Sequence, residues 1–515
     1  MMKRYLLIAL ITLVTVGTVQ GALVPDTLQI RYSNHGTQPN KPRQTLAIIS
    51  LPKVAGNLEI QTKLEGIPHE QLLECAVLLT DSLATRDLDD YKGRIPYQVV
   101  KTAGIENITL TAKQLKGHRY AYLTATIAPT SLTAETTPKV SLQVTNVHCQ
   151  GAELPLRQQK LGERIIYPVY EALFVPGDDG SKYYRIPAML KTAKGTLLVM
   201  ADRRKHHSGD LPQDIDIVLK RSDDAGRTWS KSQLIIPGKG FEKGFGDAAL
   251  VQCPSGKIIM ICVGGKGLWN STPKDPIRTY TVESTDDGKT WSAPKDITNQ
   301  IFGEGCTNPE RAQWLAAFCA SGHGICSATG RVMFVTAVRE NQRWNLSNYL
   351  LYSDDEGENW HLSERAFEGG DEAKVVELPN GDILMSVRNK HRGDRYFVSS
   401  SDNGIHWTAT ARYAKLHDPV VNGTPIVVHA QNKPYLLHSL PKGPGRQLGR
   451  IYAYDLQEWK WVSALDVAPG PNAYSDILQL DNDNIAYISE EDNNISLVYI
   501  QVPLSRVLPQ PKAVK

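Results

Sequence analysis

The chain has 515 residues, which is more than one ordinary globular domain holds. Hydrophobic residues make up 41% and charged residues 22% of it, so the composition is that of a folded protein and excludes a disordered one. Lys and Arg total 57 against 54 Asp and Glu, and this near-balance argues against a dedicated nucleic-acid-binding protein.

The first residues have the pattern of an export signal. Lys3 and Arg4 precede an apolar run from Tyr5 to Val16, and small residues surround Gly21. This order is typical of a secretory signal peptide, so we predict removal of residues 1–21 and export to the periplasm, the cell surface or the medium. No later run is long and apolar enough to predict a membrane span.

Seven cysteines follow the signal segment. None has the paired spacing of a zinc site, and we predict neither a metal nor a cofactor, with no sequence indication of a structural calcium. An odd number of cysteines leaves at least one thiol unpaired in an exported protein. Buried free thiols are expected for most of them, with one bridge among Cys306, Cys319 and Cys326 as the alternative.

Residues 22–160 are predicted to form a separate β domain. They contain β-like stretches at Thr45–Leu51, Tyr120–Ile127 and Lys139–Val147. Pro155 and the charged stretch Arg157–Arg164 mark the expected boundary. We interpret this region as a β-sandwich.

Short apolar or alternating runs separated by Gly, Asn and Asp turns continue to the end of the chain. They include 215–219, 257–263, 331–338, 382–387 and 395–399, and few windows show a helical period, so the fold class predicted is all-β. One short helix is expected at Glu310–Cys319.

A Ser-x-Asp-x-Gly-x-Thr-Trp pattern occurs four times. The copies begin at Ser222, Ser284, Ser353 and Ser400, and their tryptophans lie 62, 69 and 47 residues apart, which is about one four-stranded unit each. Such periods are typical of a propeller or a solenoid. In a tight turn Asp accepts backbone N–H bonds, Gly takes positive φ and Trp covers the turn, so we interpret these four carboxylates as structural.

These copies resemble the Asp boxes of the sialidase (neuraminidase) superfamily. The resemblance implies a six-bladed β-propeller catalytic domain over residues 164–515, with the boxes on hairpins away from the active site. Bacterial sialidases often carry a carbohydrate-binding module before the propeller, so glycan binding is a hypothesis for residues 22–160. The alternative is a purely structural domain that packs on the propeller.

Three arginines resemble those that bind the substrate carboxylate in this family. Arg185 lies in Tyr-Arg-Ile-Pro, 37 residues before the first box; the other two are Arg388 and Arg446, with Arg450 as the competitor for the third position. A similar sequence around Arg94 lies 128 residues before the first box and is assigned to the other domain. Guanidinium groups stay charged and bind carboxylates bidentately, which suits the carboxylate on the anomeric carbon of sialic acid.

The resemblance also implies a nucleophile and a base. Tyr474 matches the nucleophile region, Glu372 the glutamate that pairs with it, and Glu490 the acidic residue that holds Arg185. A carboxylate nucleophile would be repelled by the substrate's own carboxylate, and sialidases use a tyrosine instead. Because an unperturbed tyrosine has a pKa of about 10, it needs a base within hydrogen-bonding reach.

The general acid predicted by the resemblance is Asp210, in a loop before the strand that leads to the first box. It would protonate the leaving oxygen and then deprotonate water. Arg204 and Asp247 match positions that contact ring hydroxyls in the family. The neighbours that compete for these assignments are Asp214, Asp216 and Arg203.

The function predicted from these matches is that of a retaining exo-α-sialidase. It would hydrolyse terminal sialic acids from glycoproteins, glycolipids and oligosaccharides through a tyrosyl covalent intermediate, with sialylated glycoconjugates as its partners. One alternative is a trans-sialidase, which depends on acceptor-site aromatics such as Trp269 or Trp344. Another is a non-catalytic Asp-box propeller that only binds glycan. No motif sets the oligomeric state.

Overall fold

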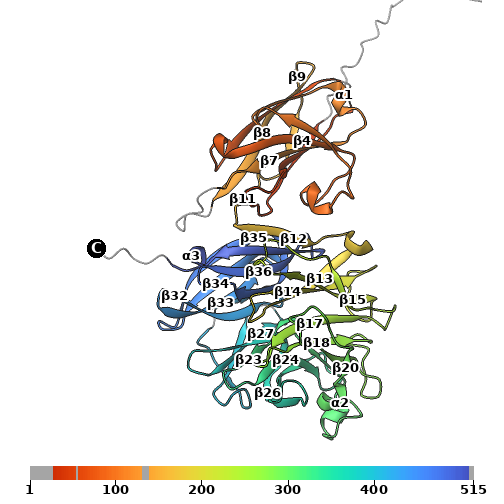
Figure 1. The fold of residues 1–515 in the computed structure, drawn as a ribbon, viewed down its shortest axis with the longest axis vertical. Coiled ribbons are helices and arrows are strands. Elements are labelled where there is room, and N and C mark those ends of the chain that lie inside the picture. The colour runs from red at the N-terminus through yellow and green to blue at the C-terminus, as the bar shows by residue number, and fades with distance from the viewer. Residues whose placement is uncertain (1–26, 54–55, 130–137, 392, 414, 510–515) are drawn as a thin grey trace, which may run out of the picture.

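A computed structural model describes residues 27–53, 56–129, 138–391, 393–413 and 415–509, so the predicted signal peptide at 1–21 lies outside the described residues. The described chain is almost entirely β-structure, which confirms the all-β prediction. Figure 1 shows a smaller amino-terminal domain, coloured red to orange, next to a larger body coloured yellow to blue. No helix in the described part of the chain has the length and apolar character needed to cross a bilayer.

The amino-terminal domain is a sandwich of two sheets. One has the order β10-β1-β2-β7-β4-β5, made by Leu156–Gln158, Leu28–Tyr32, Gln44–Ser50, Tyr120–Ile127, Leu72–Thr80 and Gln98–Thr102. The other has the order β11-β8-β3-β6, with β9 beside β8, made by Arg164–Ile165, Lys139–Cys149, Leu58–Glu65, Asn107–Leu110 and Ala152–Glu153. Alternate residues of β3 are buried, and one apolar cluster takes side chains from both sheets. Short turns of helix are η1 (His69–Gln71), η2 (Leu88–Tyr91) and α1 (Ala112–Leu115).

The larger body is a β-propeller in which the described strands form six four-stranded antiparallel blades. Blade 1 contains β13 to β16, at Tyr183–Lys191, Leu197–Arg204, Ile215–Ser222 and Gln233–Ile236. Blade 2 contains β17 to β20, at Phe245–Gln252, Ile258–Gly264, Arg278–Ser284 and Lys295–Asp296. Smaller elements around the blades are η3 (Asp178–Gly180), α2 (Thr298–Ile301), η4 (Arg311–Gln313), β21 (Ala316–Cys319), β22 (Gly322–His323), β28 (Gly393–Asp394), β31 (His417–Asp418) and α3 (Leu504–Val507).

Two long strands each belong to two blades. Strand β26 (His361–Glu377) pairs with β25 as far as Gly370 and with β27 from that residue onward. Strand β35 (Lys460–Gln479) likewise pairs with β34 up to Pro471 and with β36 from Asn472. The other strands of blades 3 and 4 are β23 (Ile325–Cys326), β24 (Val332–Arg339), β25 (Leu346–Ser353), β27 (Ile383–Asn389), β29 (Tyr396–Ser400) and β30 (Thr408–Ala409).

The last two blades join the end of the propeller to its beginning. Their strands, besides β35, are β32 (Thr424–Ala430), β33 (Lys433–Pro441), β34 (Gln447–Asp455), β36 (Asn484–Glu491) and β37 (Ser496–Pro503). The first strand of the propeller region, β12 (Val169–Phe174), pairs antiparallel with β37, so blade 6 contains strands from both ends of the region. This pairing joins the two ends of the region, as expected for the propeller that the Asp-box resemblance implied.

Each Asp box forms the turn between the third and fourth strands of blades 1 to 4. In the first box, the Asp224 carboxylate accepts hydrogen bonds from Thr228 N at 2.8 Å and Thr228 Oγ1 at 2.6 Å. Gly226 has a φ of 82°, and Trp229 Nε1 donates to its carbonyl at 3.0 Å. The carboxylates are occupied by their own turns, which agrees with a structural role.

Two expectations about chain segments are wrong. The helix expected at Glu310–Cys319 is a short turn, η4, followed by strand β21, because Ala316–Cys319 pairs with β24 and the sheet satisfies its backbone groups. The expected start of the propeller at residue 164 is too early, since β11 pairs with β8 of the sandwich. The buried Arg164 guanidinium also binds Asp87 there, at 2.8 and 2.9 Å.

All seven cysteines are free thiols, so the alternative of a bridge among Cys306, Cys319 and Cys326 is wrong. Six of the thiols are buried and Cys326 is half-buried, as expected for most of them. Burial raises the pKa of Cys319 to about 12, which keeps this side chain protonated at neutral pH.

Replacement of an Asp-box carboxylate is expected to destabilise the fold. Asp355 accepts hydrogen bonds from Ser353 Oγ at 2.7 Å, Asn359 N at 2.9 Å and Asn359 Nδ2 at 2.7 Å. Desolvation raises the pKa of Asp355, but the bonds donated by Asn359 and Ser353 outweigh it and lower the pKa to about 2. Asp355→Ala should therefore lower the free energy of unfolding by about 1 kcal/mol at neutral pH, measured as a lower Tm.

The loss of stability caused by Asp355→Ala should become smaller as the pH falls from about 4, the pKa of Asp355 in the unfolded chain, toward 2. Over this range the Asp355 carboxylate of the folded wild type becomes protonated and its stabilising contribution disappears. Glu358→Ala, in the same turn, is the control, since the Glu358 side chain is exposed and its ion pairs, to Lys295 at 3.3 Å and Lys257 at 4.0 Å, are weak. An equal loss of Tm in both variants would contradict the structural role of the box.

Candidate active site

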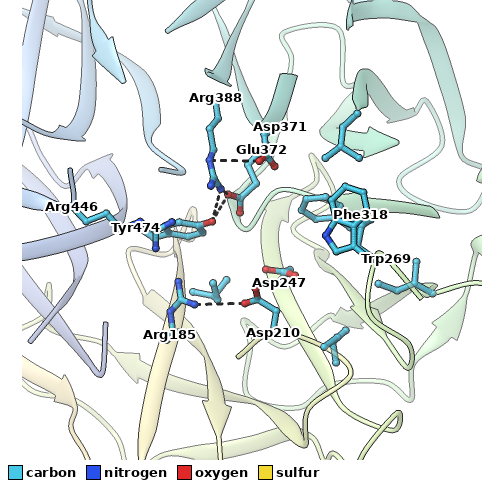
Figure 2. Close-up of a pocket in the computed structure, with 15 residues that line it drawn as sticks. Arg185, Asp210, Asp247, Trp269, Phe318, Asp371, Glu372, Arg388, Arg446 and Tyr474 are labelled. Carbon is cyan, nitrogen blue, oxygen red and sulfur yellow. Dashed lines mark hydrogen bonds and ion pairs between the residues drawn. The ribbon is translucent and has the colours of Figure 1, made fainter. Parts of the chain in front are cut away.

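A cavity of about 430 Å³ opens where the inner strands of the blades converge. Figure 2 shows charged side chains on one side of it and apolar ones on the other. Its lining includes seven of the nine residues predicted for the site: Arg185, Asp210, Asp247, Glu372, Arg388, Arg446 and Tyr474. The other two, Arg204 and Glu490, lie behind this lining and contact it.

The same local irregularity places four of these residues. The inner strands of blades 1, 2, 4 and 6 each have a β-bulge or register shift next to Arg185, Asp247, Glu372 and Tyr474, respectively. A bulge bends a strand and re-aims a side chain, and it interrupts the ladder at each of these points. Ile186 and Asp247 have φ values of 60° and 56°, in the left-handed region that side chains other than Gly rarely adopt.

Three arginines surround the ring of Tyr474. The guanidinium carbons of Arg185, Arg388 and Arg446 lie 5.5, 5.8 and 5.3 Å from the ring centroid. Arg450, the competitor for the third position, pairs instead with Asp466 at 2.5 Å, outside the cavity lining. Three permanent positive charges at this spacing make the floor of the cavity a site for an anion.

Carboxylates fix two of these arginines. Both oxygens of the fully buried Glu490 accept from Arg185, at 3.0 Å from Nε and 3.3 Å from Nη2, and Glu490 Oε1 also accepts from Ile186 N at 2.9 Å. Arg388 contacts Glu372, and its Nε lies 3.7 Å from Asp371 Oδ2. Glu490 is therefore placed to orient an arginine and does not face the cavity.

Tyr474 and Glu372 form a buried pair. The Tyr474 hydroxyl donates to Glu372 Oε2, and Arg388 Nη1 donates to the Tyr474 oxygen at 2.7 Å. Burial, helped by the neighbouring carboxylate, raises the pKa of Tyr474 well above its usual value, while the arginines oppose this. Burial also raises the pKa of Glu372, against the effect of Arg388. The phenol is thus held protonated beside a carboxylate that can accept its proton.

Asp210 lies across the cavity, with much of its side chain exposed. Its Oδ1 is 2.7 Å from Arg204 Nη1 and 3.6 Å from Arg185 Nη1. Desolvation opposes ionisation of Asp210, but the charges of Arg204 and Arg185 outweigh it and hold its pKa below the usual value. In the unliganded protein Asp210 is therefore a carboxylate at neutral pH.

The predicted ring-contacting residues have different surroundings. Arg204 is 1% exposed, and its guanidinium binds Asp202 and Asp210 without lining the cavity. Asp247 does line it, and its backbone N–H donates to Asp202 Oδ1 at 3.1 Å. Burial and the adjacent Asp202 charge raise the pKa of Asp247 well above its usual value, so its carboxyl group is disposed to be a hydrogen-bond donor.

Sequence reasoning missed part of the cavity. Asp371 lines it beside Arg388, and its only signal was that it adjoins Glu372. The apolar wall comes from loops and strands of blades 1 to 3 that carry no motif: Leu211, Leu268, Ile277, Phe318 and Leu346. Within the described residues, no group of three or more His, Cys, Asp or Glu side chains is arranged to hold a metal ion.

The chain combines a six-bladed propeller, Asp boxes and an arginine-lined cavity around a Tyr–Glu pair, and comparison with known proteins identifies its family. Residues 195–488 match the family described as BNR repeat-like domain. The chain is 30% identical over 317 residues to a sialidase of Bacteroides fragilis, covering 58% of this chain and 55% of that protein. It is 31% identical over 356 residues to a sialidase of Micromonospora viridifaciens, covering 64% and 53%.

Among solved structures, the Hadza microbial sialidase Hz136 superposes with a TM-score of 0.71 at 22% identity, covering 93% of this chain and all of that one. This likeness extends the shared fold to the amino-terminal domain. The protein belongs to the bacterial sialidase family with Asp-box (BNR) repeats. It spans about half the length of the two curated relatives.

Proposed function

We propose that the protein is a retaining exo-α-sialidase that hydrolyses terminal sialic acids from glycoproteins, glycolipids and oligosaccharides. The observation that carries this proposal is the placement of three arginines around the Tyr474–Glu372 pair in one cavity. A carboxylate ligand would be held by the arginines directly above the phenol. Membership of the sialidase family supports the same assignment.

In the first step, the substrate carboxylate binds Arg185, Arg388 and Arg446, which places the anomeric carbon over the Tyr474 oxygen. Glu372 accepts the phenolic proton as this oxygen forms a bond to the anomeric carbon. Asp210 donates its proton to the glycosidic oxygen, the glycosidic bond breaks and the aglycone leaves. Substrate binding favours the protonated form of Asp210, since a carboxylate on Arg185 offsets one of the charges that lower its pKa, while Arg204 keeps its contact with Asp210.

In the second step, Asp210 takes a proton from water, and the water oxygen attacks the anomeric carbon. The bond to Tyr474 breaks, and Glu372 returns the proton to the phenolate. Two displacements at one carbon restore the original configuration, so the product is the α-anomer. Asp247, whose carboxyl group is disposed to donate, is proposed to contact a ring substituent; Arg204 is proposed to act by holding Asp210.

A second candidate is a trans-sialidase, favoured by one feature of the rim. Trp269 lines the cavity and lies 4.4 Å from Trp344, centroid to centroid, and Trp344 is 73% exposed. Exposed aromatic faces can bind the apolar face of an acceptor sugar, which would then replace water in the second step. Sialyllactose that is labelled in its lactose unit, mixed with excess unlabelled lactose, separates the two activities. Hydrolysis gives free sialic acid, whereas transfer gives unlabelled sialyllactose.

We also propose that the chain is exported after cleavage near Gly21 and that the amino-terminal sandwich contacts glycans. The first rests on the charged and apolar pattern of residues 1–21, and the second on its position before a sialidase propeller. Mass spectrometry of the protein from its native host would test cleavage. A glycan array probed with the full-length protein carrying Tyr474→Phe would test binding without turnover.

The direct test of the proposed function is release of free sialic acid from sialyllactose by the purified protein, with α2-3 and α2-6 linkages assayed separately. Release from either linkage is expected. Binding of sialyllactose without release would favour the non-catalytic propeller and would contradict the proposal.

Removal of the proposed nucleophile or acid should abolish turnover without unfolding the protein. Tyr474→Phe and Asp210→Ala are each expected to lower kcat/KM by at least about 100-fold while the Tm stays within a few degrees of the wild type. Tyr452→Phe is the matched control, because Tyr452 also lies beside an arginine, Arg450, but outside the cavity. A rate near that of the wild type in either variant would refute the role assigned to that residue.

Binding of free sialic acid should be accompanied by proton uptake. The charges of Arg204 and Arg185 hold the pKa of unliganded Asp210 below its usual value, and neutralisation of Arg185 by the ligand should raise it, so the complex should take up protons in the acidic range. Calorimetric titrations at pH 4 to 5, in buffers with different ionisation enthalpies, would measure this uptake. Asp210→Asn should remove it; an equal uptake in that variant would show that another group titrates.

A further inference from the structure

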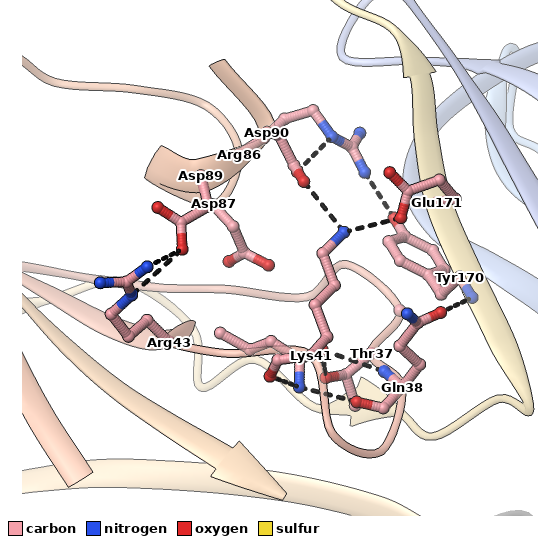
Figure 3. Close-up of polar contacts among 12 residues, drawn as sticks. Thr37, Gln38, Lys41, Arg43, Arg86, Asp87, Asp89, Asp90, Tyr170 and Glu171 are labelled. Atoms are coloured by element: carbon pink, nitrogen blue, oxygen red, sulfur yellow. Dashed lines mark hydrogen bonds and ion pairs between the residues drawn. The ribbon is translucent and has the colours of Figure 1, made fainter. Parts of the chain in front are cut away.

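The two domains meet through buried charges. Figure 3 shows side chains of the sandwich, among them Lys41 and Arg86, reaching to Glu171 and Tyr170 on β12. Arg86 is 2% exposed, and its Nη2 donates to the Tyr170 hydroxyl at 2.6 Å. Its Nη1 donates to Glu491 Oε2 at 3.1 Å and to Asp492 Oδ2 at 2.8 Å. One guanidinium of the amino-terminal domain thus binds three side chains of blade 6.

Glu491, one of the side chains that Arg86 binds, is next in sequence to Glu490 of the candidate site. Glu490 and Glu491 are consecutive in β36, and successive side chains of a strand point to opposite faces. Glu490 accordingly contacts Arg185, whereas Glu491 contacts Arg86. Both carboxylates are buried, at 0% and 3% exposed, so neither can exchange its arginine for water.

The turn that follows β36 is held by the same domain. Asp492, Asn493 and Asn494 have φ values of 55°, 62° and 67°, and three consecutive left-handed residues without Gly are unfavourable on their own. Asp492 accepts from Arg86 and lies 3.0 Å from His35 Nε2, so two side chains of the sandwich fix the turn.

The residue after this turn contacts the strand that carries Arg185. The carbonyl of Ile495, directly after the turn, accepts from Tyr184 N at 3.2 Å, and Tyr184 precedes Arg185 in β13. The hairpin of β36 and β37 therefore supports Arg185 twice: the Glu490 carboxylate holds the guanidinium, and the Ile495 carbonyl holds the adjacent backbone.

We propose that Arg86 is a positioning residue for the substrate-carboxylate site: it holds the β36–β37 hairpin so that Glu490 and Ile495 keep Arg185 in place. The inference rests on the proposed function and adds a part to it, because a residue of the amino-terminal domain then sets substrate affinity. Without Arg86, two buried carboxylates lose their cation and the left-handed turn loses a support. Arg185 binds the carboxylate in both the ground state and the transition state, so its displacement should raise KM more than it lowers kcat.

The test uses Arg86→Met in the full-length protein, with Lys41→Met as the matched control. Lys41 is another cation of the interface, half-buried, 3.0 Å from Asp90 and 3.3 Å from Glu171, but its ion pairs do not include the hairpin. Both variants should have a lower Tm. At a temperature where both are folded, Arg86→Met should raise KM for sialyllactose about tenfold with a smaller change in kcat, and Lys41→Met should leave KM within about twofold.

A double-mutant cycle shows whether Arg86 acts through Arg185. Arg185→Lys should raise KM about tenfold in the wild type but less than about threefold in Arg86→Met, because the arginine is already displaced there. Fully multiplicative effects, or a wild-type KM in folded Arg86→Met, would overturn the proposal. If Arg86→Met does not fold, Asp492→Asn replaces it, because Asn tolerates the left-handed turn and only weakens the contact with Arg86. The same rise in KM is expected for Asp492→Asn. An unchanged KM in this variant would overturn the proposal.

Hydrogen exchange tests the positioning role independently of activity. Amides of residues 184–186 and 490–495 should exchange faster in Arg86→Met than in Lys41→Met. Equal exchange in the two variants would overturn the proposal. A wild-type protein that releases no sialic acid would instead refute the proposed function, and the exchange data would still decide whether Arg86 supports the hairpin.

Discussion

The structure depends on holding three guanidinium groups within 5.3 to 5.8 Å of one tyrosine ring. Like charges at this spacing repel one another, and the repulsion is strong where water is excluded. Buried carboxylates on neighbouring strands balance it, Glu490 at Arg185 and Glu372 at Arg388. The propeller supplies these partners because its inner strands converge, and bulges in four of them direct the side chains into the cavity.

The same positive field accounts for the protonation states of the cavity. Together with Arg204, it lowers the pKa of Asp210, and it limits the rise in the pKa of Tyr474 that burial causes. In the proposed mechanism, the anion that the arginines bind also offsets part of the charge that lowers the pKa of Asp210. The amino-terminal domain meets the strand that carries Glu490 from its other face, where Arg86 binds the neighbouring Glu491.

Local patterns predicted the all-β class and the repeats, and the family resemblance that these repeats carried predicted the propeller and much of the cavity. The Asp boxes set the repeat, and the expected strand at 120–127 coincides with β7, because alternation and turn residues are local signals. Seven of nine predicted site residues line one cavity. Contacts between distant segments decided the features that sequence reasoning missed. Strand β21 forms where a helix was expected at Glu310–Cys319, because it pairs with β24. The apolar wall of the cavity has no local sequence signal, and neither has the contact between Arg86 and Glu491, which are 405 residues apart.

The configuration of the first sugar released tests the central claim, a double displacement at Tyr474, most directly. Proton NMR of sialyllactose hydrolysis, recorded before the product mutarotates, would follow the two anomers of sialic acid. The account predicts that α-sialic acid appears first and that the β-anomer grows only at the rate of mutarotation. Initial release of the β-anomer would mean a single displacement by water and would contradict a covalent intermediate at Tyr474.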